Sequence, residues 1–200
     1  MWVHGGGRHL FPGSGFPAET GGAGAPGSSV NVALAPFAGD DTYRAAMERV
    51  VVPAVRAFAP DAIVAQCGVD HHHADPLSHM LTTMPLYPDL WDALVGLADE
   101  ACAGRLVALG GGGYEPCPAP PRAWAALAAR MAGVAVGPAP VPESWRAIAL
   151  RAGCPEPAHG WFEDAGPASD GDRDRRAAAE SEAAIQQTLV AHSRFLLSGG

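Results

Sequence analysis

Short continuous apolar runs alternate with segments of helical period along most of this chain. The runs VNVAL at 30–34, AIVAQCG at 62–68 and RLVALGGGG at 105–113 predict buried strands. Between them, apolar residues spaced at i, i+3 and i+4 predict a helix over 41–58, and a proline at the start and a glycine at the end predict a second helix over 88–104. This alternation predicts an α/β fold with a parallel sheet and right-handed crossover connections.

Proline and glycine refine these boundaries. Pro53 removes a backbone donor and should kink the first helix, whereas proline and glycine bound the second. Further helices are predicted over 121–132 and over 172–197, where the Ala-, Glu- and Arg-rich segment has a thin apolar face and reads as peripheral. Residues 1–28 are rich in glycine and proline without either period, which predicts a long loop.

Composition narrows the class of protein. The 200 residues are enough for one domain with a tail, and the net charge of -8 without a basic run argues against nucleic acid as a partner. No apolar run approaches the roughly 20 residues that span a bilayer, so no membrane partner is expected. The four cysteines have no C-x-x-C spacing and are expected to be reduced thiols in a cytoplasmic protein: Cys67, Cys102, Cys117 and Cys154.

Polar residues cluster directly after two of the predicted strands. Asp70 and three histidines follow the strand at 62–68, and the glycine run ending at Tyr114 follows the strand at 105–113. In an open parallel sheet, ligands bind outside the carboxyl ends of the strands. The two stretches are therefore expected to meet at one edge of the sheet.

Each of these residues also has a purely structural interpretation. Asp70 could cap local backbone amides as readily as it could bind a metal ion. His71 and His73 are expected to be solvated imidazoles of the loop, His79 could simply be packed, and the role of His72 stays open.

The glycine run leaves similar alternatives. It allows backbone to pass close to a ligand, and Tyr114 could project its hydroxyl into a cleft or pack as an ordinary aromatic residue. The run lacks the G-x-G-x-x-G register, so a nucleotide-binding domain is only a third, weaker hypothesis.

Several motifs together resemble a known family. HGGGRHLFPGSG, VNVAL, FAPDAIVAQCGVD, ADPLSH and LGGGGYE, in this order, resemble the zinc-dependent histone deacetylase superfamily, and the stretch around DPLSHMLTT looks most like bacterial acetoin utilization proteins of the AcuC type. The resemblance covers roughly residues 3–150. It implies a three-layer parallel sheet of the arginase/deacetylase type, present here as an incomplete C-terminal portion over 1–160, followed by a peripheral tail over 161–200.

The resemblance also implies roles for five residues. Asp70 matches an aspartate ligand of the catalytic metal, which is zinc or iron(II), and Tyr114 matches the catalytic tyrosine that hydrogen-bonds the acetyl carbonyl. Phe11, Leu77 and Gly112 match positions that line or border the substrate channel. The implied activity is hydrolysis of acetyl-lysine or a small acetylated amine, and the full-length family also holds a structural potassium ion.

The family's upstream motifs are not found in this chain. A paired histidine and an aspartate-x-histidine segment, which supply the acid/base pair and the other two metal ligands, do not lie ahead of His4. Met1 could therefore be an internal start, and Trp2 stands where relatives usually carry a serine. His72 repeats the aspartate-x-histidine spacing after Asp70, but the resemblance implies a family feature near the pocket. The alternative function is an inactive remnant, or a module that binds acyl-lysine or metal.

Overall fold

The computed structural model describes residues 1–6, 13–117, 119–137, 139–154 and 157–196. In chain order its elements are β1 (Trp2–Gly5), β2 (Asn31–Leu34), α1 (Asp40–Ala46), the π-helical turn η1 (Met47–Val51), α2 (Val52–Phe58), β3 (Ile63–Gln66), α3 (Leu86–Cys102), β4 (Leu106–Leu109), α4 (Pro120–Met131), α5 (Glu143–Arg151) and α6 (Gly171–Leu196). The predicted α/β fold is confirmed.

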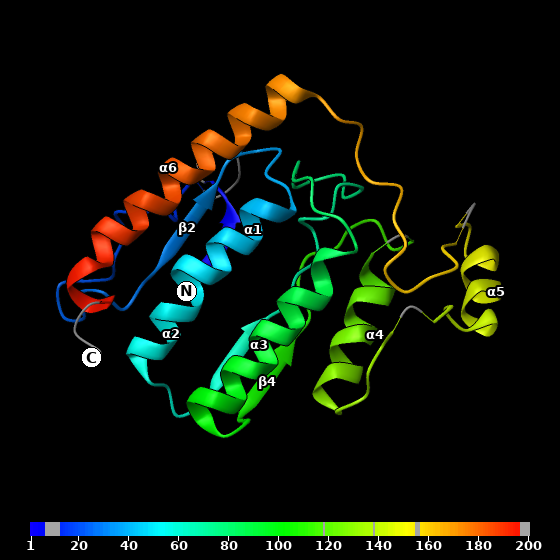
Figure 1. Ribbon diagram of the computed structural model, residues 1–200, viewed down its shortest axis with the longest axis horizontal. Helices are drawn as coiled ribbons and strands as arrows, with labels where there is room; N and C mark the ends of the chain where they lie inside the picture. The colour runs from blue at the N-terminus through cyan, green and yellow to red at the C-terminus, as the bar shows by residue number, and fades with distance from the viewer. Residues whose placement is uncertain (7–12, 118, 138, 155–156, 197–200) are drawn as a thin grey trace.

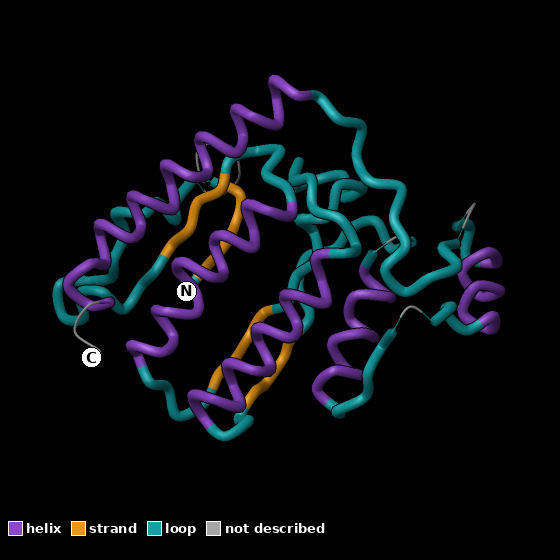
Figure 2. Tube along the Cα trace, in the orientation of Figure 1, coloured by secondary structure: helices purple, strands orange, loops and turns teal. Residues whose placement is uncertain are grey.

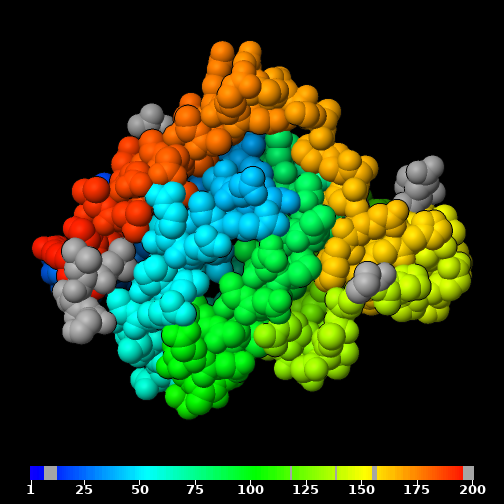
Figure 3. Space-filling model, viewed as in Figure 1, coloured from blue at the N-terminus to red at the C-terminus, as the bar shows by residue number. Residues whose placement is uncertain are grey.

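The strands form two parallel pairs, β1 with β2 and β3 with β4. Helices α1, α2 and α3 lie along one side of these strands, α6 runs beside β2, and α5 lies apart at one end of the molecule (Figures 1 and 2). Figure 3 shows residues 157–170 at the surface, between the part of the molecule formed by α5 and the start of α6. The C-terminal helix α6 therefore lies beside β2, a strand from the beginning of the chain.

Apolar side chains from most of these elements form one core. Its largest fully buried apolar members come from β2, the η1 turn, the loop after β3, the start of α3 and the middle of α6: Leu34, Val32, Val50, Val69, Met80, Met84, Leu86, Tyr87 and Ile185. Burying a side chain of this size contributes roughly 1.5–3 kcal/mol. The core therefore extends from the strands to the loop that carries Asp70 and to the C-terminal helix.

The beginning of the chain differs from the prediction of a long loop over 1–28. Residues Trp2–Gly5 form β1, which pairs in register with Asn31–Leu34, and the Trp2 amide donates to the Val30 carbonyl at 2.8 Å. Four residues, two of them His4 and Gly5, are too few to show a strand period. Pairing with β2 supplies the stabilisation that the local sequence lacks.

The predicted helix over 41–58 forms, with an irregularity at its centre. The π-helical turn Met47–Val51 separates α1 from α2, and Pro53 lies in the first turn of α2. Proline cannot donate to the carbonyl four residues earlier, and its ring crowds that carbonyl. A π turn at this point accommodates the proline, so the kink expected there takes the form of a wider turn.

The C-terminal helix α6 joins the core through polar as well as apolar side chains. Ser181 Oγ accepts a hydrogen bond from the Ala35 amide at 3.0 Å, and Thr188 Oγ1 donates to the Asn31 carbonyl at 2.7 Å. Ile185, between them, is 1% exposed. The spacing of apolar residues alone understates how much of α6 faces the core. Ser181 and Thr188 also face it, because they hydrogen-bond the backbone just after β2 and at its first residue.

Two of the cysteines are paired, so the prediction of four reduced thiols is wrong. Cys117 and Cys154 form a disulfide with a Cα–Cα distance of 5.5 Å, whereas Cys67 and Cys102 are free and buried. The pair is 37 residues apart. Their proximity depends on the path of α4 and α5, which cysteine spacing does not reveal.

One face of the β3–β4 pair is open in the described part of the chain. Side chains alternate between the two faces of a strand. Ala65 and Ala108 pack toward the core, whereas Val64, Val107 and Leu109 point away and are 68%, 53% and 52% exposed. Among the described helices, none has the length and apolar character needed to cross a bilayer.

Candidate active site at the carboxyl ends of β3 and β4

The loops that follow β3 and β4 lie against each other. The Val69 amide donates to the Gly112 carbonyl at 2.7 Å, which extends the pairing of the two strands into the loops. At Gly111 a Cβ would come within 2.7 Å of the Gly68 Cα, so the two glycines permit an approach that side chains would prevent. This contact brings the two sequence stretches together as expected from the ends of adjacent parallel strands.

The Asp70 carboxylate lies directly against Gly112. A Cβ at position 112 would be 2.4 Å from both Cγ and Oδ2 of Asp70. Burial raises the pKa of Asp70, its own backbone amide opposes that rise, and the negative charge of Asp75 adds to it. No cation or other side chain in the described residues pairs with this carboxylate, so a bound metal ion would offset the cost of burying its charge.

Tyr114 is tied to the same loop through its backbone. Its amide donates to Asp75 Oδ2 at 2.8 Å, while Asp75 Oδ1 accepts from the amides of Leu77 and Ser78 at 2.9 and 3.2 Å. The Tyr114 and Leu77 side chains are each 55% exposed. The structure therefore gathers Asp70, Gly112, Leu77 and the Tyr114 backbone around one loop, whereas Phe11 lies outside the described residues.

The histidines after Asp70 are not the solvated imidazoles predicted for His71 and His73. The His71 ring stacks on Tyr43 with centroids 4.7 Å apart and lies 5.3 Å from the Tyr87 ring. Burial, followed by the proximity of His72, lowers the pKa of His71 to about 3. Its buried Nε2 has no partner among the described residues, so His71 is a neutral imidazole packed against Tyr43 and Tyr87. His79 is exposed.

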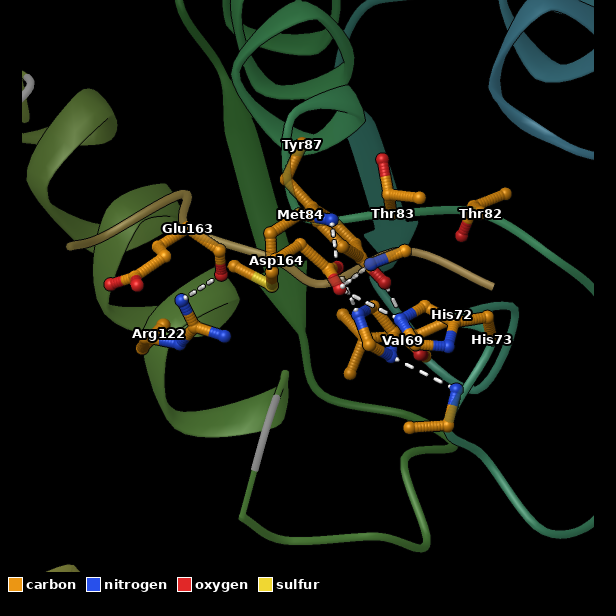
Figure 4. A network of polar contacts seen from close by, with 12 residues as sticks. Val69, His72, His73, Thr82, Thr83, Met84, Tyr87, Arg122, Glu163 and Asp164 are labelled. Atoms are coloured by element: carbon orange, nitrogen blue, oxygen red, sulfur yellow. Dashed lines mark hydrogen bonds and ion pairs between the residues drawn. The ribbon is translucent and has the colours of Figure 1, made fainter. Parts of the chain in front are cut away.

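His72 and His73 both bind Asp164, a residue that the sequence did not single out. Each Nε2 lies 2.7 Å from a different carboxylate oxygen of Asp164 (Figure 4). The exposed fractions of the three side chains are 2%, 17% and 7%. Asp164 is 91 residues beyond His73 in a segment without a regular period, so no sequence signal connects it to the site.

These three residues also have the composition of a metal site, because their candidate ligand atoms lie within 4.8 Å of one another. The geometry is that of hydrogen bonds. Tetrahedral zinc with bonds of about 2.0–2.2 Å separates its ligand atoms by about 3.3 Å, more than the 2.7 Å observed. His72 Nδ1 accepts from the Ala74 amide at 3.2 Å, so its proton lies on Nε2, which donates to Asp164.

The described residues therefore fit a catalytic zinc only in part. Asp70 is available as one carboxylate ligand, His71 is stacked on Tyr43, and His72 and His73 are hydrogen-bonded to Asp164. A catalytic zinc uses three protein ligands. Two further ligands would have to come from outside the described residues.

Comparison with known proteins connects this arrangement to a family. Residues 1–131 match the histone deacetylase domain family. Acetoin utilization protein AcuC of Bacillus subtilis is 36% identical over 143 residues, covering 72% of this chain and 37% of the relative, and a probable deacetylase of Archaeoglobus fulgidus is 34% identical over 136 residues, covering 68% and 38%.

A solved structure shows the same fold. The HD domain of HDA15 superposes with a TM-score of 0.62 and 22% identity, covering 98% of this chain and 43% of that chain. The chain thus spans less than half the length of the relatives it matches.

Proposed function

Because the chain belongs to the histone deacetylase family, we propose that it forms part of a deacetylase of the AcuC type. The proposed reaction is hydrolysis of the amide bond of acetyl-lysine or of a small acetylated amine. A role linked to acetoin utilization is part of the proposal, since the similar AcuC proteins carry that name.

One observation carries this proposal. Asp70, a half-buried carboxylate without a compensating cation among the described residues, lies against the backbone at Gly112, and the loop bearing Tyr114 is hydrogen-bonded to the loop bearing Asp70. Perturbed carboxylates at the carboxyl ends of parallel strands are typical of functional sites. The nucleotide-binding alternative is disfavoured, because this carboxylate lies against the glycine run and would repel a phosphate.

We assign Asp70 as one ligand of a divalent metal, zinc or iron(II), whose remaining ligands lie outside the described residues. When bound, such a metal supplies polarisation of the carbonyl and activation of water. The described residues fill only one of the three protein ligand positions that a catalytic zinc uses. The structural potassium ion that the family resemblance implies is also part of the proposal, without an assigned residue.

The chain's own contribution to catalysis is assigned to Tyr114. Its phenol is more than half exposed and makes no hydrogen bond within the described residues, so it is free to donate to the substrate oxygen as negative charge develops. Leu77, exposed on the neighbouring loop, is assigned to the mouth of the channel, and Phe11 to its wall.

The test is acetate release from an acetyl-lysine peptide by the metal-loaded chain. Tyr114→Phe should lower kcat about 10²–10³-fold, the usual effect of removing one donor to a developing oxyanion. Tyr43→Phe is the matched control, because it removes the same atom from a buried ring stacked on His71 and should change kcat less than about threefold. Equal losses in the two variants would contradict the role of Tyr114.

The second candidate function is a module that binds acyl-lysine or metal without catalysis. It is favoured by the single carboxylate ligand, Asp70, that the described residues leave available for a metal ion. This function predicts that an acetyl-lysine peptide binds, that zinc binds below one equivalent and that no acetate is released. Turnover that depends on Tyr114 would exclude it.

A further inference from the structure

Asp164 is the most densely hydrogen-bonded carboxylate described near the site. Besides the bonds from His72 and His73, its oxygens accept from the Met84 amide at 2.8 Å (Figure 4) and from the Gly166 amide at 2.9 Å. Burial opposes the charged form, but the hydrogen bonds from the two histidines and the two backbone amides together outweigh it and hold the pKa of Asp164 well below its usual range. Hydrogen bonds from four donors hold this carboxylate in one position.

The segment that carries Asp164 is itself held in place. We call residues 159–166 the strap. Arg122 of α4, 3% exposed, donates from Nη1 to three strap carbonyls, those of Gly160, Trp161 and Glu163, at 2.9, 3.2 and 2.7 Å. The Glu163 carboxylate accepts from the amides of His159 and Gly160, which closes the strap into a turn. These hydrogen bonds anchor the strap, and with it Asp164, to α4.

The histidines that Asp164 holds are adjacent to the proposed metal ligand. His72 and His73 follow Asp70 by two and three residues, and their backbone amides donate to the carbonyls of Val69 at 3.2 Å and Thr82 at 2.9 Å. Val69, immediately before Asp70, donates in turn to the Gly112 carbonyl. Holding the two imidazoles in place therefore also restrains the backbone on either side of Asp70, at Val69 and at His72.

We propose that Asp164 is a positioning residue of the candidate active site, which clamps the His72–His73 pair so that the Asp70 carboxylate is held against Gly112. The strap is then an integral part of the site, although it lies beyond residues 1–131, where the family match ends. The proposal rests on the proposed function only for the purpose of this positioning; the clamp itself can be tested without substrate.

The test is to measure amide hydrogen exchange by NMR in the Asp164→Asn variant. The asparagine side chain has one acceptor oxygen and one donor nitrogen. It therefore cannot accept from the two histidines through two separate oxygens, as Asp164 does. The amides of Met84 and Gly166, bonded directly to Asp164, should lose protection in any case. Positioning predicts that the amides of Val69 and Tyr114, which do not touch Asp164, also lose protection about tenfold or more, the size of one hydrogen bond to a charged group.

The control is Asp172→Asn, whose carboxylate is 76% exposed and pairs with Arg175 one helical turn away. It should leave the exchange of Val69 and Tyr114 unchanged. Amides of α3 should keep their protection in both variants. If Asp164→Asn affects Met84 and Gly166 alone, Asp164 anchors only the strap and the proposal is wrong.

A second pair of variants covers the case in which Asp164→Asn does not fold. His73→Ala removes one of the two imidazole donors, whereas His73→Gln keeps an N–H that can reach Asp164 Oδ1. The clamp predicts lost protection at Val69 in the alanine variant and its recovery in the glutamine variant. Equal protection in the two variants would overturn the proposal.

Two further measurements distinguish the hydrogen-bonded clamp from a metal centre and from the proposed deacetylase function. Zinc bound at one equivalent in Asp70→Ala but not in Asp164→Asn would show a metal centre at the clamp and overturn the hydrogen-bonded assignment. If the wild-type chain releases no acetate, the proposed function fails while the exchange result still decides the clamp. If it does release acetate, Asp164→Asn should lower kcat with KM unchanged.

Discussion

The contact between Gly112 and Asp70 gives the sharpest prediction about the candidate site. In Gly112→Ala, the new Cβ would lie 2.4 Å from Cγ and Oδ2 of Asp70 and 2.8 Å from Oδ1. Favourable contacts between nonbonded heavy atoms lie near 3.5–4.0 Å, so the carboxylate or the loop must move by about 1 Å. The displaced groups belong to two loops that are hydrogen-bonded to each other at Val69, so the strain is shared by both.

Overpacking of this kind typically destabilises a protein by about 1–3 kcal/mol. In a chain of this length, that range corresponds to a decrease in Tm of about 2–12 °C. Urea unfolding and a thermal melt both measure the effect. The Asp70 carboxylate would also leave its place beside the glycine run, so any metal affinity or acetate release that depends on Asp70 should fall together with stability.

Gly110→Ala is the matched control in the same run of glycines. Nothing lies within 4 Å of a Cβ at position 110, and its backbone is not in the left-handed region. Replacing such a glycine is neutral or stabilises by up to about 1 kcal/mol, because the unfolded chain loses freedom. A Gly112→Ala variant as stable as Gly110→Ala would refute the close contact.

A double-mutant cycle identifies the partner in the contact. Asp70→Ala removes the three atoms that a Cβ at position 112 would meet. The double variant should therefore recover about 1–2 kcal/mol relative to the sum of the two single variants. Effects that add within about 0.5 kcal/mol would show that Gly112 is sensitive for another reason.

Three other predictions concern the surrounding framework. Cys117→Ser should lower the free energy of unfolding by about 3–4 kcal/mol, because the disulfide with Cys154 closes a long loop of the unfolded chain. Urea unfolding with and without a reductant measures this change. The stability of the variant should no longer depend on the reductant. The folded state keeps His71 neutral down to about pH 3, whereas the unfolded state takes up a proton below about pH 6.5. Stability should therefore fall as pH drops from 6.5 toward 3, by up to about 1.4 kcal/mol per pH unit, and less steeply in His71→Phe; identical slopes in urea titrations would contradict a buried neutral imidazole. Ser181→Ala leaves the buried Ala35 amide without its acceptor and should cost about 1–3 kcal/mol in the same assay, while an unchanged midpoint would mean that water replaces the hydroxyl.

The candidate site was only partly predictable from the sequence. Asp70 and Gly112 could be brought together in advance, because adjacent parallel strands end at one edge and each residue follows such a strand closely. Asp164 could not. It belongs to a segment rich in proline and glycine without regular period, and its place beside His72 depends on Arg122 holding the strap. The burial of His71 was equally hidden, since it comes from stacking on Tyr43 of a distant helix.

The sequence by itself determined the α/β alternation, the positions of the predicted strands and helices, and the likeness to the deacetylase family, because these depend on local periodicity, on turn residues and on motifs contiguous in the chain. Tertiary structure alone decided the pairing of Trp2–Gly5 with β2, the disulfide, the polar face of α6 and the clamp at Asp164. Each of these stabilises a group through a partner far away along the chain. The free energy of such a contact is absent from any local window of sequence, and it appears only when folding brings the two segments together.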